Sequence, residues 1–231
     1  MIWPNWDAWL RLFNIAVIDV ALSGDNAIVI GMAAASLPRG QRRWAIVFGG
    51  ACAIGLRIVL TSMATLLMLI PFLAAAGGLV LVWVVYKLLR ADLDEDGSAD
   101  EARRASTFRQ AIFLITVADF MMSLDNVIAV AGTAAGSIPL LVVGLLLSMP
   151  LLLTTGGVIS MLIDRMRWIV WLGAIAISFT AARMVLEDEG VKVRLHPSHA
   201  AVLISAAAAG LLIPAACWGL QIRRLRVAAK E

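Results

Sequence analysis

Seven long apolar segments divide this 231-residue chain and limit what it can fold into. They run over residues 10–35, 44–69, 72–90, 108–132, 139–163, 168–186 and 199–220. Each supplies roughly the ~20 apolar residues that a helix needs to cross a hydrocarbon core about 30 Å thick. Hydrophobic residues make up 61% of the chain and charged residues 15%, which is more apolar surface than a soluble domain of this size can bury. The sequence therefore predicts an all-α membrane protein with seven transmembrane helices.

A polar motif occurs twice inside these apolar segments. Both copies read Asp-x-x-x-Ser-x-Asp-Asn, and they begin at Asp19 and Asp119. The motif residues are Asp19, Ser23, Asp25 and Asn26 in the first copy, and Asp119, Ser123, Asp125 and Asn126 in the second. A charged side chain at membrane depth costs at least about 2.5 kcal/mol on insertion scales, so four carboxylates need a compensating partner. The simplest partner is a cation.

The two motif copies belong to a longer internal repeat. Asp19 aligns with Asp119, and Pro38 aligns with Pro139. The first three predicted helices thus form one repeat unit, and the next three form a second. Because each unit crosses the membrane an odd number of times, the second unit enters the membrane from the opposite side. Two inverted three-helix repeats are a common construction of secondary transporters, which bind substrate near the midplane at the repeat interface.

The domain organisation follows from this repeat. We expect transmembrane repeat 1 at 1–90, a hydrophilic cytoplasmic loop at 91–107, repeat 2 at 108–186, and an additional C-terminal helix with a basic tail at 187–231. The last helix has no counterpart in the repeat, so we expect it at the periphery of the bundle.

Basic residues are distributed unevenly between the two sides of the predicted bundle. One side holds 14 of the 19 lysines and arginines, the other holds four, and Arg57 lies within a span. The 14 are Arg39, Arg42, Arg43, Lys87, Arg90, Arg103, Arg104, Arg109, Arg165, Arg167, Arg223, Arg224, Arg226 and Lys230. Because cytoplasmic loops are enriched in Lys and Arg, we expect this side to be cytoplasmic, with the N-terminus outside and the C-terminus inside the cytoplasmic (inner) membrane.

A regular helix does not bring the four polar groups of one motif copy together. Asp19, Ser23 and Asn26 share one helical face, whereas Asp25 points about 120° away. A helix break at Ser23 and Gly24 would change this, and the freed carbonyls would be tolerated at membrane depth only where they line a cavity or bind an ion. The second copy has Leu124 in place of Gly24, so the two half-sites need not be equivalent.

The oxygen atoms of the motif are hard ligands. Carboxylate, amide and carbonyl oxygens suit Mg²⁺, Ca²⁺ and Mn²⁺. Ser23 and Ser123 add hydroxyls that can coordinate a metal or cap a broken helix. Neither His196 nor His199 lies at membrane depth, and no cysteine belongs to the motif, so Zn²⁺ and Cu⁺ are disfavoured.

A simpler interpretation of Asp19 needs no ligand. Arg57 is the sole basic residue deep in a predicted span and must itself be neutralised, so Asp19 could pair with Arg57 or cap a broken helix. This interpretation accounts less well for the whole duplicated arrangement, because two identical polar sets are hard to explain as scaffolding.

The motif copies resemble those of a known family. Leu22-Ser23-Gly24-Asp25-Asn26 paired with Met122-Ser123-Leu124-Asp125-Asn126, on a chain of this length, is similar to the short, YjbE-type branch of the TerC family of integral membrane proteins. The resemblance implies a lysine-exporter-like superfamily fold and manganese efflux. It implies a metal site formed by Asp19, Asp25, Asn26, Asp119, Asp125 and Asn126.

We therefore expect a secondary transporter, and not an enzyme, that exports Mn²⁺ in exchange for protons. Facing carboxylates bind protons and metal competitively, which is the physical basis of an antiporter. The expected partners are a divalent metal ion as cargo, protons and the lipid bilayer, with no resident cofactor and no nucleic acid. Homo-oligomerisation and the choice between Mn²⁺ and Ca²⁺ stay open. Two alternatives also stay open: an exporter of a small cationic solute such as an amino acid, and a metal-sensing membrane scaffold.

Overall fold

The computed structural model describes residues 6–63, 67, 70–93, 101–134, 138–195 and 197–228, and the side chains within these ranges except at 6–8, 91–93, 101–106, 125–134, 138, 141 and 221–228. The described residues form helices and contain no strand. In chain order the helices are α1 (Trp6–Leu22), α2 (Gly24–Ala35), α3 (Arg39–Ser62), α5 (Leu73–Leu93), α6 (Glu101–Ala134), α7 (Ile138–Arg165), α8 (Trp168–Glu187), α9 (Glu189–Leu195) and α10 (His199–Ala228).

The described helices correspond to the predicted membrane spans, with differences in their bounds. Helix α6 begins at Glu101, within the predicted loop at 91–107, and α3 ends at Ser62, whereas its predicted span ran to 69. Six of them, α3, α5, α6, α7, α8 and α10, are long and apolar enough to cross a membrane, and α1 with α2 makes a seventh span if the bent pair counts as one. The predicted fold class, an all-α membrane protein, is thereby confirmed. The short helix α9, which follows α8, was not predicted.

The first span is broken at the first motif copy. Helices α1 and α2 are bent by 57° at Ser23, whose backbone (φ −101°, ψ 12°) is not helical. The predicted break at Ser23 and Gly24 is therefore present. In contrast, α6 runs unbroken through the second copy. This difference agrees with helix propensity, because glycine in a helix costs about 1 kcal/mol relative to alanine and leucine costs little.

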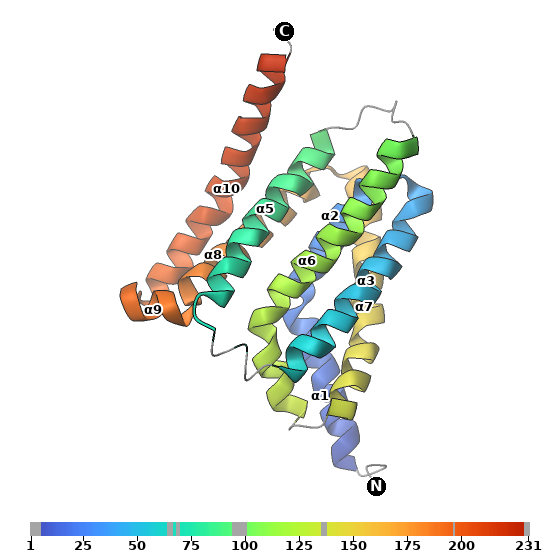
Figure 1. Cartoon of the computed structure of the whole chain (residues 1–231), viewed down its shortest axis with the longest axis vertical. Coiled ribbons are helices and arrows are strands. Elements are labelled where there is room, and N and C mark those ends of the chain that lie inside the picture. The colour runs from blue at the N-terminus through green and yellow to red at the C-terminus, as the bar shows by residue number, and fades with distance from the viewer. Residues whose placement is uncertain are drawn as a thin grey trace.

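Successive spans run in opposite directions, so that α1 begins and α10 ends at opposite ends of the bundle (Figure 1). Helix α3 begins, and α5 and α7 end, at the end where α10 finishes. The helix ends that carry Arg39, Arg42, Arg43, Arg90 and Arg165 therefore gather at one end of the molecule, as the predicted distribution of basic residues requires. Which side of the membrane this end faces stays a prediction.

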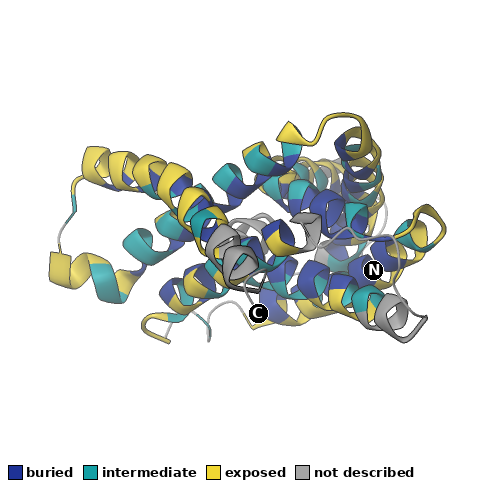
Figure 2. Ribbon diagram, turned by 90° about the horizontal axis from the view of Figure 1, so that it is seen from above, coloured by how far each residue is buried: buried dark blue, intermediate teal, exposed yellow. Residues whose placement is uncertain are grey.

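The core lies between α2, α3, α5, α6, α7 and α8. Figure 2 shows the buried parts of the helices turned toward the inside of the bundle and the exposed parts turned outward. Ile115 of α6 and Ile177 of α8 are among the fully buried core residues, whereas Phe13, Met161 and Ile204 are exposed. An outer surface of large apolar side chains suits contact with lipid.

Glycines let the helices approach closely, as small residues do in membrane proteins. A Cβ atom on Gly144 of α7 would lie 2.4 Å from Cγ2 of Ile15, and one on Gly49 of α3 would lie 2.9 Å from Cγ2 of Ile115. Ile15 and Ile115 stand one hundred positions apart, at the same offset as the two motif copies. Each isoleucine thus packs on a glycine of the other three-helix repeat unit. These reciprocal contacts are what a repeat predicts, while the inverted symmetry itself stays a prediction.

The contact between α5 and α8 allows a test of this packing. A Cβ atom on Gly78 would lie 2.4 Å from the carbonyl oxygen of Ala181, so Gly78→Ala forces two backbones apart, whereas a Cβ on Gly55 of α3 meets nothing within 4 Å. We expect Gly78→Ala to destabilise the detergent-solubilised protein by about 1–3 kcal/mol. Gly55→Ala should leave stability unchanged or raise it. Thermal unfolding followed by size-exclusion chromatography measures both, and equal midpoints would contradict this helix contact.

Candidate functional site

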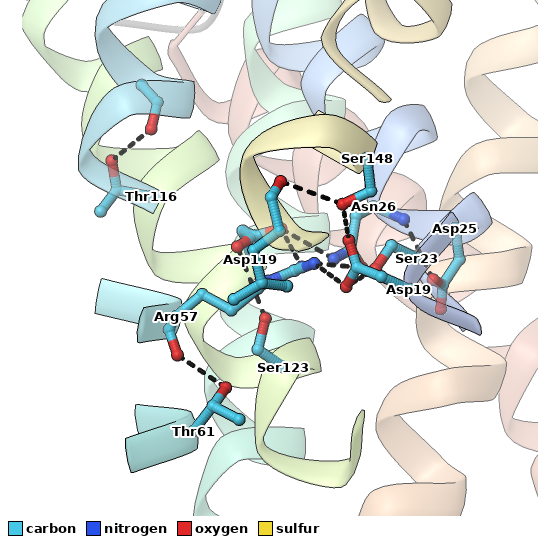
Figure 3. Close-up of polar contacts among 12 residues, drawn as sticks. Asp19, Ser23, Asp25, Asn26, Arg57, Thr61, Thr116, Asp119, Ser123 and Ser148 are labelled. Atoms are coloured by element: carbon cyan, nitrogen blue, oxygen red, sulfur yellow. Dashed lines mark hydrogen bonds and ion pairs between the residues drawn. The ribbon is translucent and has the colours of Figure 1, made fainter. Parts of the chain in front are cut away.

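A polar cluster is buried where α1, α2, α3, α6 and α7 meet (Figure 3). Every member is at most 3% exposed. The members are Asp19 of α1, Ser23 at the helix break, Asn26 of α2, Arg57 of α3, Asp119 and Ser123 of α6, and Ser148 of α7. The cluster therefore joins five of the predicted site residues with two others, from both halves of the chain.

Arg57 lies between the two leading carboxylates of the motif. Its Nη1 donates to Oδ1 of Asp19 at 2.5 Å and to Oγ of Ser23 at 3.0 Å, and its Nη2 donates to Oδ1 of Asp119 at 2.7 Å. The interpretation that Asp19 pairs with Arg57 is thus confirmed, and the pairing extends to Asp119. Counted as formal charges, two carboxylates and one guanidinium carry one negative charge in excess.

Asn26 connects α2 to the second motif copy. Its Nδ2 donates to Oδ1 of Asp119 at 2.8 Å, and its Oδ1 is buried without a hydrogen-bond donor among the described residues. The acceptor on Asp119 sets the orientation of this amide, because the opposite orientation would direct an oxygen at a carboxylate. An unsatisfied buried carbonyl oxygen is costly, and a cation or water would relieve that cost.

The outer carboxylate oxygens contact serine hydroxyls. Oγ of Ser148 lies 2.5 Å from Oδ2 of Asp19 and 3.0 Å from the carbonyl oxygen of Leu145, and Oγ of Ser123 lies 3.5 Å from Oδ2 of Asp119. Ser148 was not predicted as a site residue. In the sequence, Ser148 is recognisable only as a small polar residue within an apolar span. Thr155 of the same helix has the same feature, yet it is exposed and donates to the carbonyl oxygen of Leu151, so this feature does not identify a site residue.

Asp25 does not join the cluster despite the helix break beside it. Its Oδ2 accepts from Oγ1 of Thr180 on α8 at 3.2 Å, and its Oδ1 accepts from the backbone N–H of Asn26 at 3.0 Å. Asp25 therefore connects α2 to α8. The side chains of Asp125 and Asn126 lie outside the described residues, so their predicted role stays a prediction.

The described side chains place no three His, Cys, Asp or Glu residues together as metal ligands. The cluster offers instead two carboxylates, one free amide oxygen and three hydroxyls around a position that now holds a guanidinium. These oxygen atoms therefore surround one cationic group, the guanidinium of Arg57.

A separate cavity of about 270 Å³ lies at the arginine-rich end of the bundle. Arg42 and Asp164 in its lining form a bidentate ion pair, with distances of 2.8 Å and 2.9 Å. None of the cluster residues lines this cavity.

Comparisons with known proteins agree with the motif. The model of the integral membrane protein TerC family matches residues 4–224. The chain is 38% identical over 183 residues to the uncharacterized membrane protein YjbE of Bacillus subtilis (strain 168), which covers 79% of this chain and 82% of YjbE. It is 26% identical over 249 aligned positions to YceF, an uncharacterized membrane protein of the same strain, covering 99% of this chain and 93% of YceF.

A third relative is the UPF0053 inner membrane protein YgdQ of Escherichia coli (strain K12). It is 30% identical over 144 residues, covering 56% of this chain and 60% of YgdQ. No solved structure matches the chain. Because the family model spans nearly the whole sequence, including both motif copies, the chain belongs to the TerC family of integral membrane proteins.

Proposed function

We propose that this protein is a secondary transporter that exports Mn²⁺ across the cytoplasmic membrane in exchange for protons. The observation that carries the proposal is the buried pair of Asp19 and Asp119, which occupy equivalent positions in the two motif copies and share one cation, the guanidinium of Arg57. Ionisable residues inside a membrane bundle mark ion or proton pathways.

The oxygen atoms of the cluster favour a hard divalent cation. Besides the carboxylates of Asp19 and Asp119, the unsatisfied Oδ1 of Asn26 is available as a ligand. Such a set suits Mg²⁺, Ca²⁺ and Mn²⁺, and the manganese efflux implied by the family resemblance selects Mn²⁺ from this group. The inner-membrane designation of YgdQ supports the cytoplasmic membrane as the location.

The helix break provides a place for the required movement. Ser23 lies at the bend between α1 and α2 and in the cluster itself, so a rotation of α2 carries Asp25 and Asn26 with it. If the two units are inverted repeats, rocking one against the other would open the cluster to each side in turn. Protons arriving at the same carboxylates would release the metal.

The occupied cluster also supports a second candidate function. A guanidinium already fits between Asp19 and Asp119, so the pair accommodates an organic cation. An exporter of a small cationic solute such as an amino acid would use the same two carboxylates.

Transport by the purified full chain in sealed liposomes tests the proposal. We expect Mn²⁺ to cross the membrane and to quench an internal Mn²⁺-sensitive dye faster than in protein-free liposomes. Excess lysine or arginine should leave this flux unchanged. Movement of lysine or arginine without Mn²⁺ would replace the proposal by the second candidate function. Mn²⁺ binding without any flux would indicate a metal-sensing scaffold.

A further inference from the structure

Among the described residues, the guanidinium of Arg57 hydrogen-bonds only to groups that the proposed metal site would need. Its guanidinium nitrogens donate hydrogen bonds to Asp19, Ser23 and Asp119. Its Nε is buried and has no acceptor among the described residues. Any ligand that takes over the carboxylate oxygens therefore removes the contacts that keep the guanidinium in place.

A divalent cation and the guanidinium cannot share this position. Oδ1 of Asp19 and Oδ1 of Asp119 each lie within 2.7 Å of a guanidinium nitrogen, and Oδ1 of Asp119 also accepts from Asn26. A metal bound to both oxygens would lie beside the positive charge of Arg57 in a buried, weakly screened site. Repulsion between like charges is strong in such surroundings.

We propose that Arg57 is a tethered substitute for the transported cation: it bridges Asp19 and Asp119 in the metal-free protein and leaves when a divalent cation binds. This inference rests on the proposed function. An arginine suits the task because its planar fork offers separate nitrogens to two carboxylates, which a single ammonium group cannot do in the same geometry.

The role of Arg57 as a substitute cation matters most for the step in which the metal-free transporter changes back to the conformation that loads metal. After the metal has left, either carboxylate that does not carry an exchanged proton would be costly inside a bundle without a counter-charge. Arg57 offsets one such charge. Exchange of Mn²⁺ for Mn²⁺ never requires the empty protein to return, whereas net efflux requires it in every cycle. Loss of Arg57 should therefore separate these two modes of transport.

Three measurements on the full chain, at the same pH on both sides of the membrane, test the inference. Mn²⁺ binding is measured by titration of the detergent-solubilised protein, exchange by labelled Mn²⁺ against unlabelled Mn²⁺, and net efflux into metal-free buffer. The variants are Arg57→Gln, Arg57→Lys and the matched control Arg183→Gln, which removes an exposed arginine paired with Glu187.

In Arg57→Gln we expect at least about tenfold tighter Mn²⁺ binding, because a competing charge is gone. Exchange should stay within about threefold of wild type while net efflux falls at least about tenfold, because only net efflux includes the return of the empty protein. Arg57→Lys should give intermediate values, and Arg183→Gln should behave as wild type in all three measurements.

Weaker Mn²⁺ binding in Arg57→Gln, or an equal loss of exchange and net efflux in a monodisperse preparation, would overturn the inference. If Arg57→Gln does not fold, Arg57→Lys decides, and wild-type affinity together with a wild-type ratio of net efflux to exchange would refute the bridging role. Absence of Mn²⁺ flux in the wild type would refute the proposed function instead, and the binding measurement would still test competition between Arg57 and metal.

Discussion

Asp119→Asn should reduce Mn²⁺ efflux at least about 100-fold, which corresponds to about 2.7 kcal/mol, and Asp19→Asn should have a similar effect. Each substitution removes one of the two carboxylates that Arg57 bridges. The remaining carboxylate and Arg57 then form a neutral pair, so a divalent cation entering the cluster meets no excess negative charge. Initial rates of Mn²⁺ flux, measured in liposomes with equal amounts of reconstituted protein, give the result.

The matched control is Glu187→Gln, which removes a carboxylate from the exposed ion pair with Arg183 at the end of α8. Because exposed pairs contribute only about 0–1 kcal/mol, we expect flux within about twofold of wild type. Wild-type flux in Asp119→Asn would remove this residue from the site.

The motif also predicts loss of transport in Asp25→Asn and Asp125→Asn. Since Asp25 faces Thr180, loss in Asp25→Asn would indicate that it reaches the cluster in another conformation.

The rate of Mn²⁺ release should depend steeply on pH, with opposite effects on the two sides of the membrane. Acidifying the compartment that receives Mn²⁺ should accelerate release, because protons arriving at Asp19 and Asp119 remove the charge that holds the ion. Acidifying the compartment that supplies Mn²⁺ should raise the KM, by up to about tenfold per pH unit for one competing proton. Initial rates at several Mn²⁺ concentrations and several pH values on each side separate the two effects.

A flux indifferent to pH on both sides would contradict proton exchange. If Asp119→Asn were still inactive under these conditions, the metal site would stand and the transport mode would be uniport along the Mn²⁺ gradient. The Glu187→Gln variant again serves as the control, since its carboxylate lies outside the cluster.

The parts of this protein that could be predicted from the sequence depend on local properties of the chain. Segment length and apolar content determine which stretches can cross a membrane, so the predicted spans correspond to α3, α5, α6, α7, α8, α10 and the pair α1 and α2. Gly24 in the first motif copy indicated the helix break at Ser23, and Leu124 at the equivalent position of the second copy agrees with the unbroken helix α6. The need to neutralise Arg57 was also visible, because a charge at membrane depth is costly wherever it lies.

What the sequence by itself determined is therefore which long segments form membrane-spanning helices and which charges need partners. Only the tertiary structure decided how those partners are shared: Arg57 bridges Asp19 and Asp119, Ser148 reaches Asp19 from α7, and Asp25 turns to Thr180. The physical reason is that the direction of a side chain depends on the rotation of its helix and on the 57° bend between α1 and α2. Packing between distant segments, such as Ile15 on Gly144, determines both.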